Sequence, residues 1–344
     1  MEPSRISEFI AVHELPTYRV SQFNKAFYKE YISSFDEFTT WSKELRELLK
    51  LHITFSTLHV VKEQRSQDGK TMKLVFERNS DHKQFETVLM RHEDGRNTVC
   101  VSCMIGCPVG CEFCATGKMG YRGILEASEI VDQVLHIERM LKKEQQTVTN
   151  IVFMGMGEPL LNLTAVEDAI AIITNPSKMA MSERRITIST SGITDKLQQL
   201  IDHGYKGRLA LSLHAPNQIV REQIMPIAKK YPLSALLKVL KQFAVNTNKR
   251  VSYEYILIDG VNDTISHAEQ LVKIMDTKLS HINLIPYNPV MGVSFHRSSP
   301  AAIHAFAAVL EKHHIQHTIR VTMGDDIKAA CGQLAGMTTY VEAV

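Results

Sequence analysis

The chain has 344 residues, 44% of them hydrophobic and 22% charged, which is enough for one large domain and a smaller one and excludes a disordered or miniature protein. Lys and Arg total 39 against 37 Asp and Glu, a formal net charge of +2 that excludes a strong field toward nucleic acid or membrane. The sequence contains no apolar run of about 18 residues, and its start lacks a basic segment followed by an apolar one. These features predict a cytoplasmic protein that does not engage a membrane.

Residues 1–90 are predicted to form a small α+β accessory domain. Apolar residues recur at helical spacing over Phe23–Phe35 and Phe38–Leu51, and alternating patterns predict short strands over Leu58–Val61 and Met72–Glu77.

Residues 93–330 alternate short apolar runs with amphipathic stretches, which is typical of repeated strand–helix units. The predicted strands are Thr98–Cys103, Thr149–Met154, Arg185–Thr190, Arg208–Leu213, Val251–Ile258 and His281–Ile285. The predicted helices are Glu126–Lys142, Ala165–Thr174, Leu233–Val245, Ser266–Thr277 and Ala301–His313. About six such units predict an α/β fold, as a barrel or an open parallel sheet, with the active site at the carboxyl ends of the strands.

The cysteines are concentrated in one segment. Six occur, of which five lie at Cys100, Cys103, Cys107, Cys111 and Cys114, while Cys331 stands alone near the end. The last three of the cluster form C-x3-C-x2-C, and three thiolates leave one iron of a four-iron cluster open to another ligand. Two alternatives remain at this stage: a zinc site completed by Cys103 or one of the 15 histidines, or thiols that bind no metal.

The spacing Cys107, Cys111, Cys114, with Phe113 before the last cysteine, resembles the signature of radical S-adenosylmethionine (SAM) enzymes. In that superfamily the open iron binds the amino and carboxylate groups of SAM, and an electron from the cluster cleaves SAM to a 5′-deoxyadenosyl radical. The resemblance implies a radical SAM partial (β/α)6 barrel, a [4Fe-4S] cluster, SAM, and an electron donor such as flavodoxin or ferredoxin.

Polar groups at the predicted strand ends supply candidates for binding SAM. Gly157 and Glu158, in Met-Gly-Met-Gly-Glu-Pro, resemble the superfamily's motif that holds the amino group of the cofactor. A belt around ribose and adenine is predicted from Ser189, Ser212, Leu213, His214 and Asn288. Taken singly, each of these residues could instead satisfy the backbone of a local turn.

Residues 324–336 read Gly-Asp-Asp-Ile-Lys-Ala-Ala-Cys-Gly-Gln-Leu-Ala-Gly and resemble the C-terminal motif of the RlmN and Cfr adenosine methyltransferases. The resemblance implies that Cys331, which opens a tail of residues 331–344, carries the methyl group as S-methylcysteine. It also implies that Cys100 resolves the protein–RNA adduct through a transient Cys100–Cys331 disulfide. Glu86 falls where the family has a proton acceptor; taken alone, it would be an exposed strand carboxylate.

The resemblance therefore implies a radical SAM RNA methyltransferase acting on C2 of an adenosine of 23S ribosomal RNA, with transfer RNA as a second candidate. Residues 1–90 would then be an RNA-binding accessory domain. Methylation at C8, as in Cfr, is the near alternative, because Ala115-Thr-Gly117 is closer to Cfr, whereas Gly157-Glu-Pro159 and Gly324-Asp-Asp326 are closer to RlmN. The departure of Ser102-Cys103-Met104 from the usual Ser-Ser-Gln of the family bears on which adenosine is chosen. A non-catalytic iron–sulfur or zinc-binding protein is the alternative of a different class.

Overall fold

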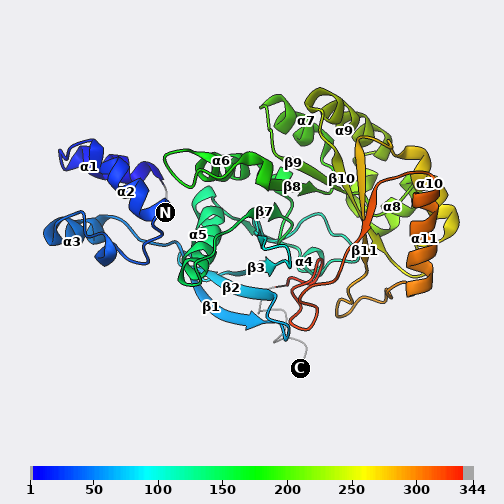
Figure 1. Cartoon of the computed structure of the whole chain (residues 1–344), viewed down its shortest axis with the longest axis horizontal. Helices are drawn as coiled ribbons and strands as arrows, with labels where there is room; N and C mark the ends of the chain where they lie inside the picture. Colours follow the sequence, from blue (N-terminus) through cyan, green and yellow to red (C-terminus); the bar gives the residue numbers. More distant parts are fainter. Residues whose placement is uncertain (1–2, 336–344) are drawn as a thin grey trace.

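The computed structural model describes residues 3–335 of the chain. Its N-terminal part is a helical lobe that projects from the rest of the molecule (Figure 1). The lobe contains α1 (Pro3–Val12), α2 (Tyr18–Tyr28), the short η1 (Phe35–Glu37) and α3 (Lys43–His52). Phe38 and Phe9 pack against the buried ring of Trp41, with centroids 4.7 and 6.4 Å away. This aromatic core holds the lobe together.

The helices of the lobe differ from the predicted ones. The prediction of a helix over Phe23–Phe35 is wrong at both ends, because α2 ends at Tyr28 and Tyr31 has a φ of 51°, which a right-handed helix does not accommodate. The helix predicted from Phe38 begins instead after Ser42, whose hydroxyl accepts a hydrogen bond from the Leu45 amide and caps α3.

One ten-stranded sheet runs through the remainder of the molecule, in the order β1-β2-β3-β4-β7-β8-β9-β10-β11-β12. Its first part is antiparallel and contains β1 (Leu58–Arg65), β2 (Thr71–Arg78), β3 (Gln84–Arg91) and β4 (Asn97–Cys100). Because β3 pairs with β4, the strands of residues 1–90 extend the sheet of the core instead of forming a separate one.

The second part of the sheet is parallel and alternates with helices. Its strands after β4 are β7 (Asn150–Phe153), β8 (Ile186–Thr190), β9 (Arg208–Ser212), β10 (Val251–Leu257), β11 (Ser280–Pro286) and β12 (His317–Ile319). The intervening helices are α5 (Ala127–Lys143), α6 (Leu163–Thr174), α7 (Thr194–Asp202), α8 (Gln218–Ile224), α9 (Leu233–Thr247), α10 (Ile265–Ile274) and α11 (Pro300–Lys312). The α/β partial barrel predicted from the sequence is confirmed.

Several shorter elements lie between these units. A two-stranded antiparallel pair, β5 (Met104–Gly106) and β6 (Tyr121–Ile124), encloses the cysteine loop and the one-turn α4 (Ala115–Lys118). Single turns of 3-10 helix occur at η2 (Pro159–Asn162), η3 (Glu183–Arg185) and η4 (Pro226–Lys229).

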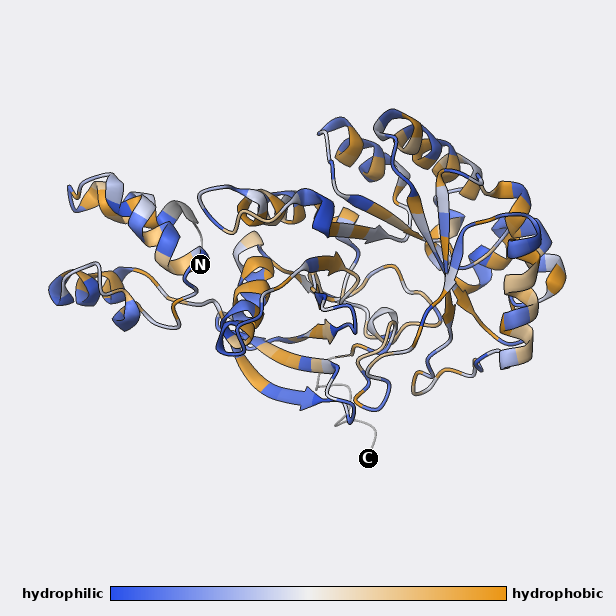
Figure 2. Cartoon of the chain, viewed as in Figure 1, coloured by the Kyte–Doolittle hydropathy of each residue, from blue (hydrophilic) through white to orange (hydrophobic). Residues whose placement is uncertain are grey.

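The helices cover the outer side of the curved sheet and turn their apolar faces toward it (Figure 2). In α5, for example, Ile130, Val134, Ile137 and Leu141 recur at helical spacing and are all fully buried. Side chains on the inner side of the sheet face a cavity of about 670 Å³. Within residues 3–335, no helix is both long and apolar enough to cross a bilayer.

Candidate active site

The three cysteines of the C-x3-C-x2-C motif lie on the loop between β5 and α4. The Cys107 amide donates to the Gly120 carbonyl at 3.0 Å, which closes the loop at its base. Gly117 lies directly against this loop, because a Cβ atom there would be 2.9 Å from both the backbone nitrogen and the backbone oxygen of Cys111. The loop conformation therefore depends on the absence of a side chain at residue 117.

The surroundings of these thiols fit a group of high positive charge. Burial raises the pKa of Cys107 to about 12 and raises the pKa values of Cys111 and Cys114, and the three would repel one another as thiolates. Backbone amides nevertheless point at the sulfurs: that of Val109 at Cys107, and those of Thr116 and Gly117 at Cys114. Amide donors to ligand sulfurs are a normal feature of iron–sulfur sites, where the irons supply the missing positive charge.

The buried side chain of Arg221 is a second feature of this site that fits a bound cofactor. Its guanidinium is fully buried and donates through Nη2 to the Ser191 carbonyl at 2.6 Å and through Nε to the Leu213 carbonyl at 3.2 Å. Nη1 is buried and has no hydrogen-bond partner among the described residues, and the charge of the side chain acts on Cys111 and Glu158. A buried donor of this kind suits an anionic group next to the cysteine loop.

The zinc alternative finds no support in the geometry. A structural zinc ion needs four ligands around one point. Among residues 3–335, no three His, Cys, Asp or Glu side chains are arranged to hold a single metal ion. Three thiolates that each bind a different iron of a cubane do not need to converge in this way.

Glu158 follows β7 and is buried at 3% exposure. Its carboxylate accepts hydrogen bonds from Thr190 Oγ1 at 2.7 Å, from the Ser191 amide at 2.7 Å and from the Leu160 amide at 3.1 Å. Burial raises its pKa. The neighbouring Gly157 has a φ of 107°, and a Cβ atom there would lie 2.6 Å from that of Met104. Glu158 thus joins the ends of β7 and β8 beside the cysteine loop.

Of the predicted belt, Ser189 and Leu213 are buried and Ser212 is half-buried. The ring of His214 packs edge-on against Phe113 of the cysteine loop, with 4.8 Å between the centroids, and its Nδ1 accepts from the Ile256 amide at 3.1 Å. Burial lowers the pKa of His214 to about 3, so the ring is neutral at physiological pH. His214 therefore packs against the cysteine loop, while its predicted contact with SAM stays a prediction.

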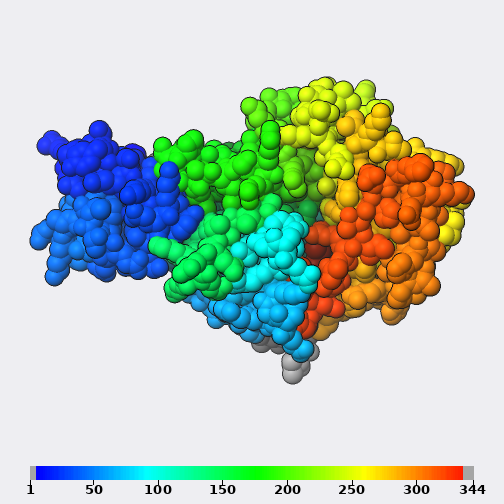
Figure 3. Space-filling view, in the orientation of Figure 1, coloured from blue at the N-terminus to red at the C-terminus, as the bar shows by residue number. Residues whose placement is uncertain are grey.

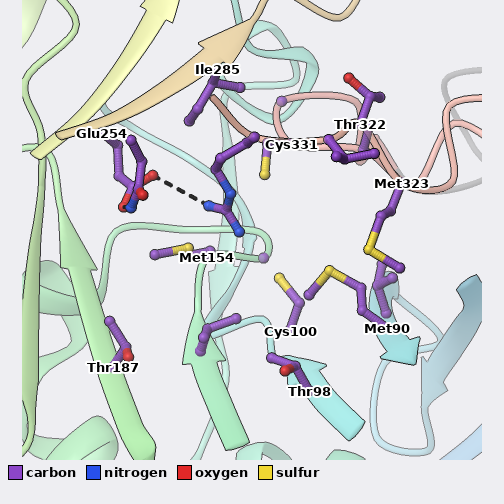
Figure 4. Close-up of a pocket in the computed structure, with 18 of the residues that line it drawn as sticks. Met90, Thr98, Cys100, Met154, Thr187, Glu254, Ile285, Thr322, Met323 and Cys331 are labelled. Carbon is purple, nitrogen blue, oxygen red and sulfur yellow. Dashed lines mark hydrogen bonds and ion pairs between the residues drawn. The ribbon is translucent and has the colours of Figure 1, made fainter. Parts of the chain in front are cut away.

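The cavity brings Cys100 and Cys331 together (Figure 4). Cys100 ends β4 and is 8% exposed, whereas Cys331 is an exposed thiol on the loop after β12. Cys114 and Asn288 line the same cavity. Burial, reinforced by Cys331, raises the pKa of Cys100 to about 12. Both cysteines are free thiols, so the predicted disulfide is not formed in this structure.

The loop that carries Cys331 is held by two hydrogen bonds to α4, the helix directly after the cysteine loop. The Ala115 amide donates to the Gly332 carbonyl at 2.7 Å, and Thr116 Oγ1 donates to the Leu334 carbonyl at 2.6 Å. From another side, Asn288 Nδ2 donates to the carbonyl of Cys331 itself at 3.2 Å. Residues 336–344 of the predicted tail lie outside the described residues.

Charged residues that the sequence analysis did not single out also line the cavity, and two of them, Arg320 and Glu254, form an ion pair. Arg320 follows β12, and its Nη1 lies 3.3 Å from Glu254 Oε2 on β10 (Figure 4). The sequence carried a signal for Glu254, which interrupts an apolar strand, whereas Arg320 takes an ordinary polar position in the alternating run Thr318–Thr322.

Glu86, the predicted proton acceptor, does not line the cavity. It is 1% exposed on β3, and Lys73 Nζ lies 3.0 Å from its Oε1. The alternative of an exposed strand carboxylate is therefore wrong, because the face of β3 that carries Glu86 is covered by other parts of the chain.

Comparisons with known proteins agree with this site. Residues 101–272 match the family model of the radical SAM superfamily. The chain is 39% identical over 331 residues to the probable dual-specificity RNA methyltransferase RlmN 2 of Protochlamydia amoebophila, covering 96% of this chain and 92% of the relative. It is 41% identical over 338 residues to the probable dual-specificity RNA methyltransferase RlmN of Salinibacter ruber, covering 96% and 91%. A crystal structure of a radical SAM methyltransferase from Sphaerobacter thermophilus superposes with a TM-score of 0.93 at 40% identity, over 97% of each chain.

The fold and the cysteine site are those of a radical SAM enzyme. Within that superfamily, the chain belongs to the RlmN family of radical SAM RNA methyltransferases. A [4Fe-4S] cluster and SAM are the cofactors of this family, as the sequence predicted. The alternative of a non-catalytic iron–sulfur or zinc-binding protein is wrong.

Proposed function

We propose that this protein methylates C2 of an adenosine in 23S ribosomal RNA and also acts on transfer RNA, with Cys331 as the carrier of the methyl group. The carrying observation is that the exposed Cys331 thiol shares one cavity with Cys100 and with Cys114 of the cysteine loop. Relatives that the chain covers almost completely are probable dual-specificity RNA methyltransferases, which supports two kinds of RNA substrate.

The separate roles of the cofactors and of the protein chain follow from the chemistry of adenine. Its C2–H bond is not acidic, so a base in the protein cannot prepare that carbon for polar transfer of a methyl group. The bound cluster and SAM supply a radical able to abstract hydrogen from a methyl group. The chain's own part is to hold the methylated sulfur of Cys331 where it meets both cofactor and base.

Cys100 would release the product. In this step its sulfur attacks that of Cys331 and a sulfur–sulfur bond forms. The bond between the Cys331 sulfur and the methylene carbon on the base breaks with its electron pair going to that carbon, which takes up a proton and becomes the methyl group. The resulting disulfide returns to two thiols at the expense of an external thiol reductant. Since the pKa of Cys100 is about 12, this attack requires removal of the thiol proton during the reaction.

The residues that bind the cluster and SAM are likewise part of this proposal. Cys107, Cys111 and Cys114 would hold the cluster. SAM would then lie between that loop and the strand ends that carry Gly157, Glu158, Ser189, Ser212, Leu213, His214 and Asn288. Nη1 of Arg221, which has no hydrogen-bond partner within residues 3–335, supports an anionic group beside Cys111 and Glu158.

RNA binding and electron supply complete the proposal. The predicted accessory domain, residues 1–90, would contact RNA through the helical lobe that projects from the sheet (Figure 1). A flavodoxin or ferredoxin would reduce the cluster.

The test is anaerobic reconstitution of the cluster, followed by incubation with SAM, a reductant and either 23S ribosomal RNA or transfer RNA. Mass spectrometry of the digested RNA separates 2-methyladenosine from 8-methyladenosine. We expect 2-methyladenosine with the wild type and none with Cys331→Ala, which should still cleave SAM. Only 8-methyladenosine would favour the Cfr-like activity, and no methylated adenosine in either RNA would contradict the proposal.

A further inference from the structure

Two oppositely charged side chains are buried together beneath the Cys331 loop, outside the cavity. Lys73 on β2 and Glu86 on β3 are 2% and 1% exposed, with 3.0 Å between Nζ and Oε1. In the antiparallel register, Lys73 is opposite Val88 and Glu86 is opposite Val75, so the two charged residues are diagonal neighbours on one face of the sheet. Moving two charges from water into the protein interior costs free energy, which their mutual attraction often does not exceed. A stabilising effect on the fold therefore does not by itself explain why this pair is buried.

Each member of the pair holds one end of the segment that carries Cys331. Lys73 Nζ donates to the Lys328 carbonyl at 3.2 Å, and Glu86 Oε2 accepts from the Ala335 amide at 2.8 Å. Cys331 lies between these two anchor points in the sequence. The pair therefore fixes the two ends of the loop whose middle carries the reactive sulfur.

The turn that precedes β2 contacts this segment at a further point. The Gln67 amide, in the turn between β1 and β2, donates to Asp326 Oδ2 at 2.8 Å. Figure 3 shows the C-terminal segment lying against these N-terminal strands. The segment itself is rich in small residues, Ala329, Ala330 and Gly332, which offer little side chain by which a loop can be held.

We propose that the Lys73–Glu86 ion pair is a clamp that positions the Cys331 loop over the cysteine loop. Lys73 and Glu86 are then positioning residues that act through Cys331. The inference rests on the proposed role of Cys331 as methyl carrier. It assigns a function to the strands that precede residues 101–272, the part matched by the superfamily model, and it gives Glu86 a role that its position outside the cavity allows.

The experiment compares wild type with Lys73→Met/Glu86→Leu, which removes both charges together and leaves no buried charge unpaired. Lys70→Met is the matched control, since it removes the exposed Lys70–Glu93 pair beside the same strands and leaves the clamp intact. All three proteins are reconstituted anaerobically. The readouts are iron content, hydrogen exchange of residues 324–335, and 2-methyladenosine formed per 5′-deoxyadenosine released.

We expect the double variant to keep its iron, to exchange at least tenfold faster over residues 324–335, and to form at least tenfold less methylated RNA per 5′-deoxyadenosine. A variant that only folds less well would form less 2-methyladenosine and less 5′-deoxyadenosine in the same proportion, so the ratio of the two would stay that of the wild type. Unchanged exchange and an unchanged ratio would overturn the clamp. Wild-type enzyme that never methylates Cys331 would instead overturn the proposed function, while the exchange data would still report on the clamp.

A second variant serves if the double variant does not fold. Ala335→Pro removes the backbone N–H group that donates a hydrogen bond to Glu86, and it leaves both charges of the pair in place. We expect the same fall in methylated RNA per 5′-deoxyadenosine with unchanged iron content. A ratio equal to that of the wild type would overturn the clamp.

Discussion

Arg320 and Glu254 form an ion pair inside the cavity that holds both reactive thiols, with 3.3 Å between Nη1 and Oε2 (Figure 4). Asn283 Nδ2 donates to the other carboxylate oxygen of Glu254 at 2.7 Å, which fixes the carboxylate on β10. The Arg320 charge acts on Cys100 and on Cys331. It lowers the pKa of Cys100 against the larger effect of burial. A fixed cation thus stabilises the thiolate at the point where the two sulfurs must react.

Removing this cation should make Cys100 less reactive. Arg320→Met raises the pKa of Cys100 further, because burial then acts without the opposing charge. If the thiolate of Cys100 loses ~1 kcal/mol of electrostatic stabilisation, its alkylation by iodoacetamide at fixed pH becomes roughly fivefold slower. The rate is measured by mass spectrometry in a Cys331→Ser background. Arg320→Lys keeps the charge and should react at close to the original rate; an equal loss in both variants would contradict an electrostatic role.

The cysteine loop should not tolerate a side chain at residue 117. In Gly117→Ala the new Cβ would lie 2.9 Å from backbone atoms of Cys111, so the loop must shift and misplace that thiol. We expect less than half of the wild-type iron per chain after reconstitution, measured by iron analysis and visible absorbance. In the control Gly95→Ala, at a residue with a φ of 82°, the new Cβ meets no atom within 4 Å, and this variant should bind iron normally. Full iron loading of Gly117→Ala would show that the loop adapts.

His136 on α5 should make the fold sensitive to acid. Its ring packs edge-on against Phe76, and burial, with a smaller effect of the Arg139 charge, lowers the pKa of His136 to about 4. Between the ordinary value of about 6.5 and pH 4, the unfolded chain binds a proton that the folded chain does not, so stability falls as the pH falls. The loss is about 2 kcal/mol between pH 7 and pH 5.

Denaturant unfolding at these two pH values measures this contribution. His136→Gln should remove about 2 kcal/mol of the pH dependence, whereas His82→Asn, which changes an exposed ring and retains His136, should keep it. If His136→Gln left the difference between pH 7 and pH 5 unchanged, the acid sensitivity would have another source.

The sequence predicted the repeated units well because each is encoded locally. The buried runs of β7 to β11 and the amphipathic patterns of α5, α6 and α9 to α11 all lie close to their predicted ranges. Helices α1, α4, α7 and α8, of 10, 4, 9 and 7 residues, were not predicted. Family motifs then identified the cysteine loop and Cys331.

Contacts between distant segments could not be predicted in this way. No local pattern relates Lys73 to Lys328, or Glu86 to Ala335, because these contacts join residues more than 240 positions apart. The same reason explains why Arg320 and Glu254 were missed as neighbours. In the sheet, β12 lies at one edge and β2 and β3 lie near the other, so the contacts to Lys73 and Glu86 are made by the chain after β12, at Lys328 and Ala335.

The most direct test of the account is mass spectrometry of the peptide that contains Cys331. Cluster-loaded enzyme is first turned over with RNA to remove any methyl group already present, and is then incubated anaerobically with SAM that carries a trideuterated methyl group. We expect a trideuterated methyl group on Cys331, which a second addition of RNA removes. A folded, iron-loaded enzyme that methylates RNA while Cys331 stays unlabelled would contradict this expectation.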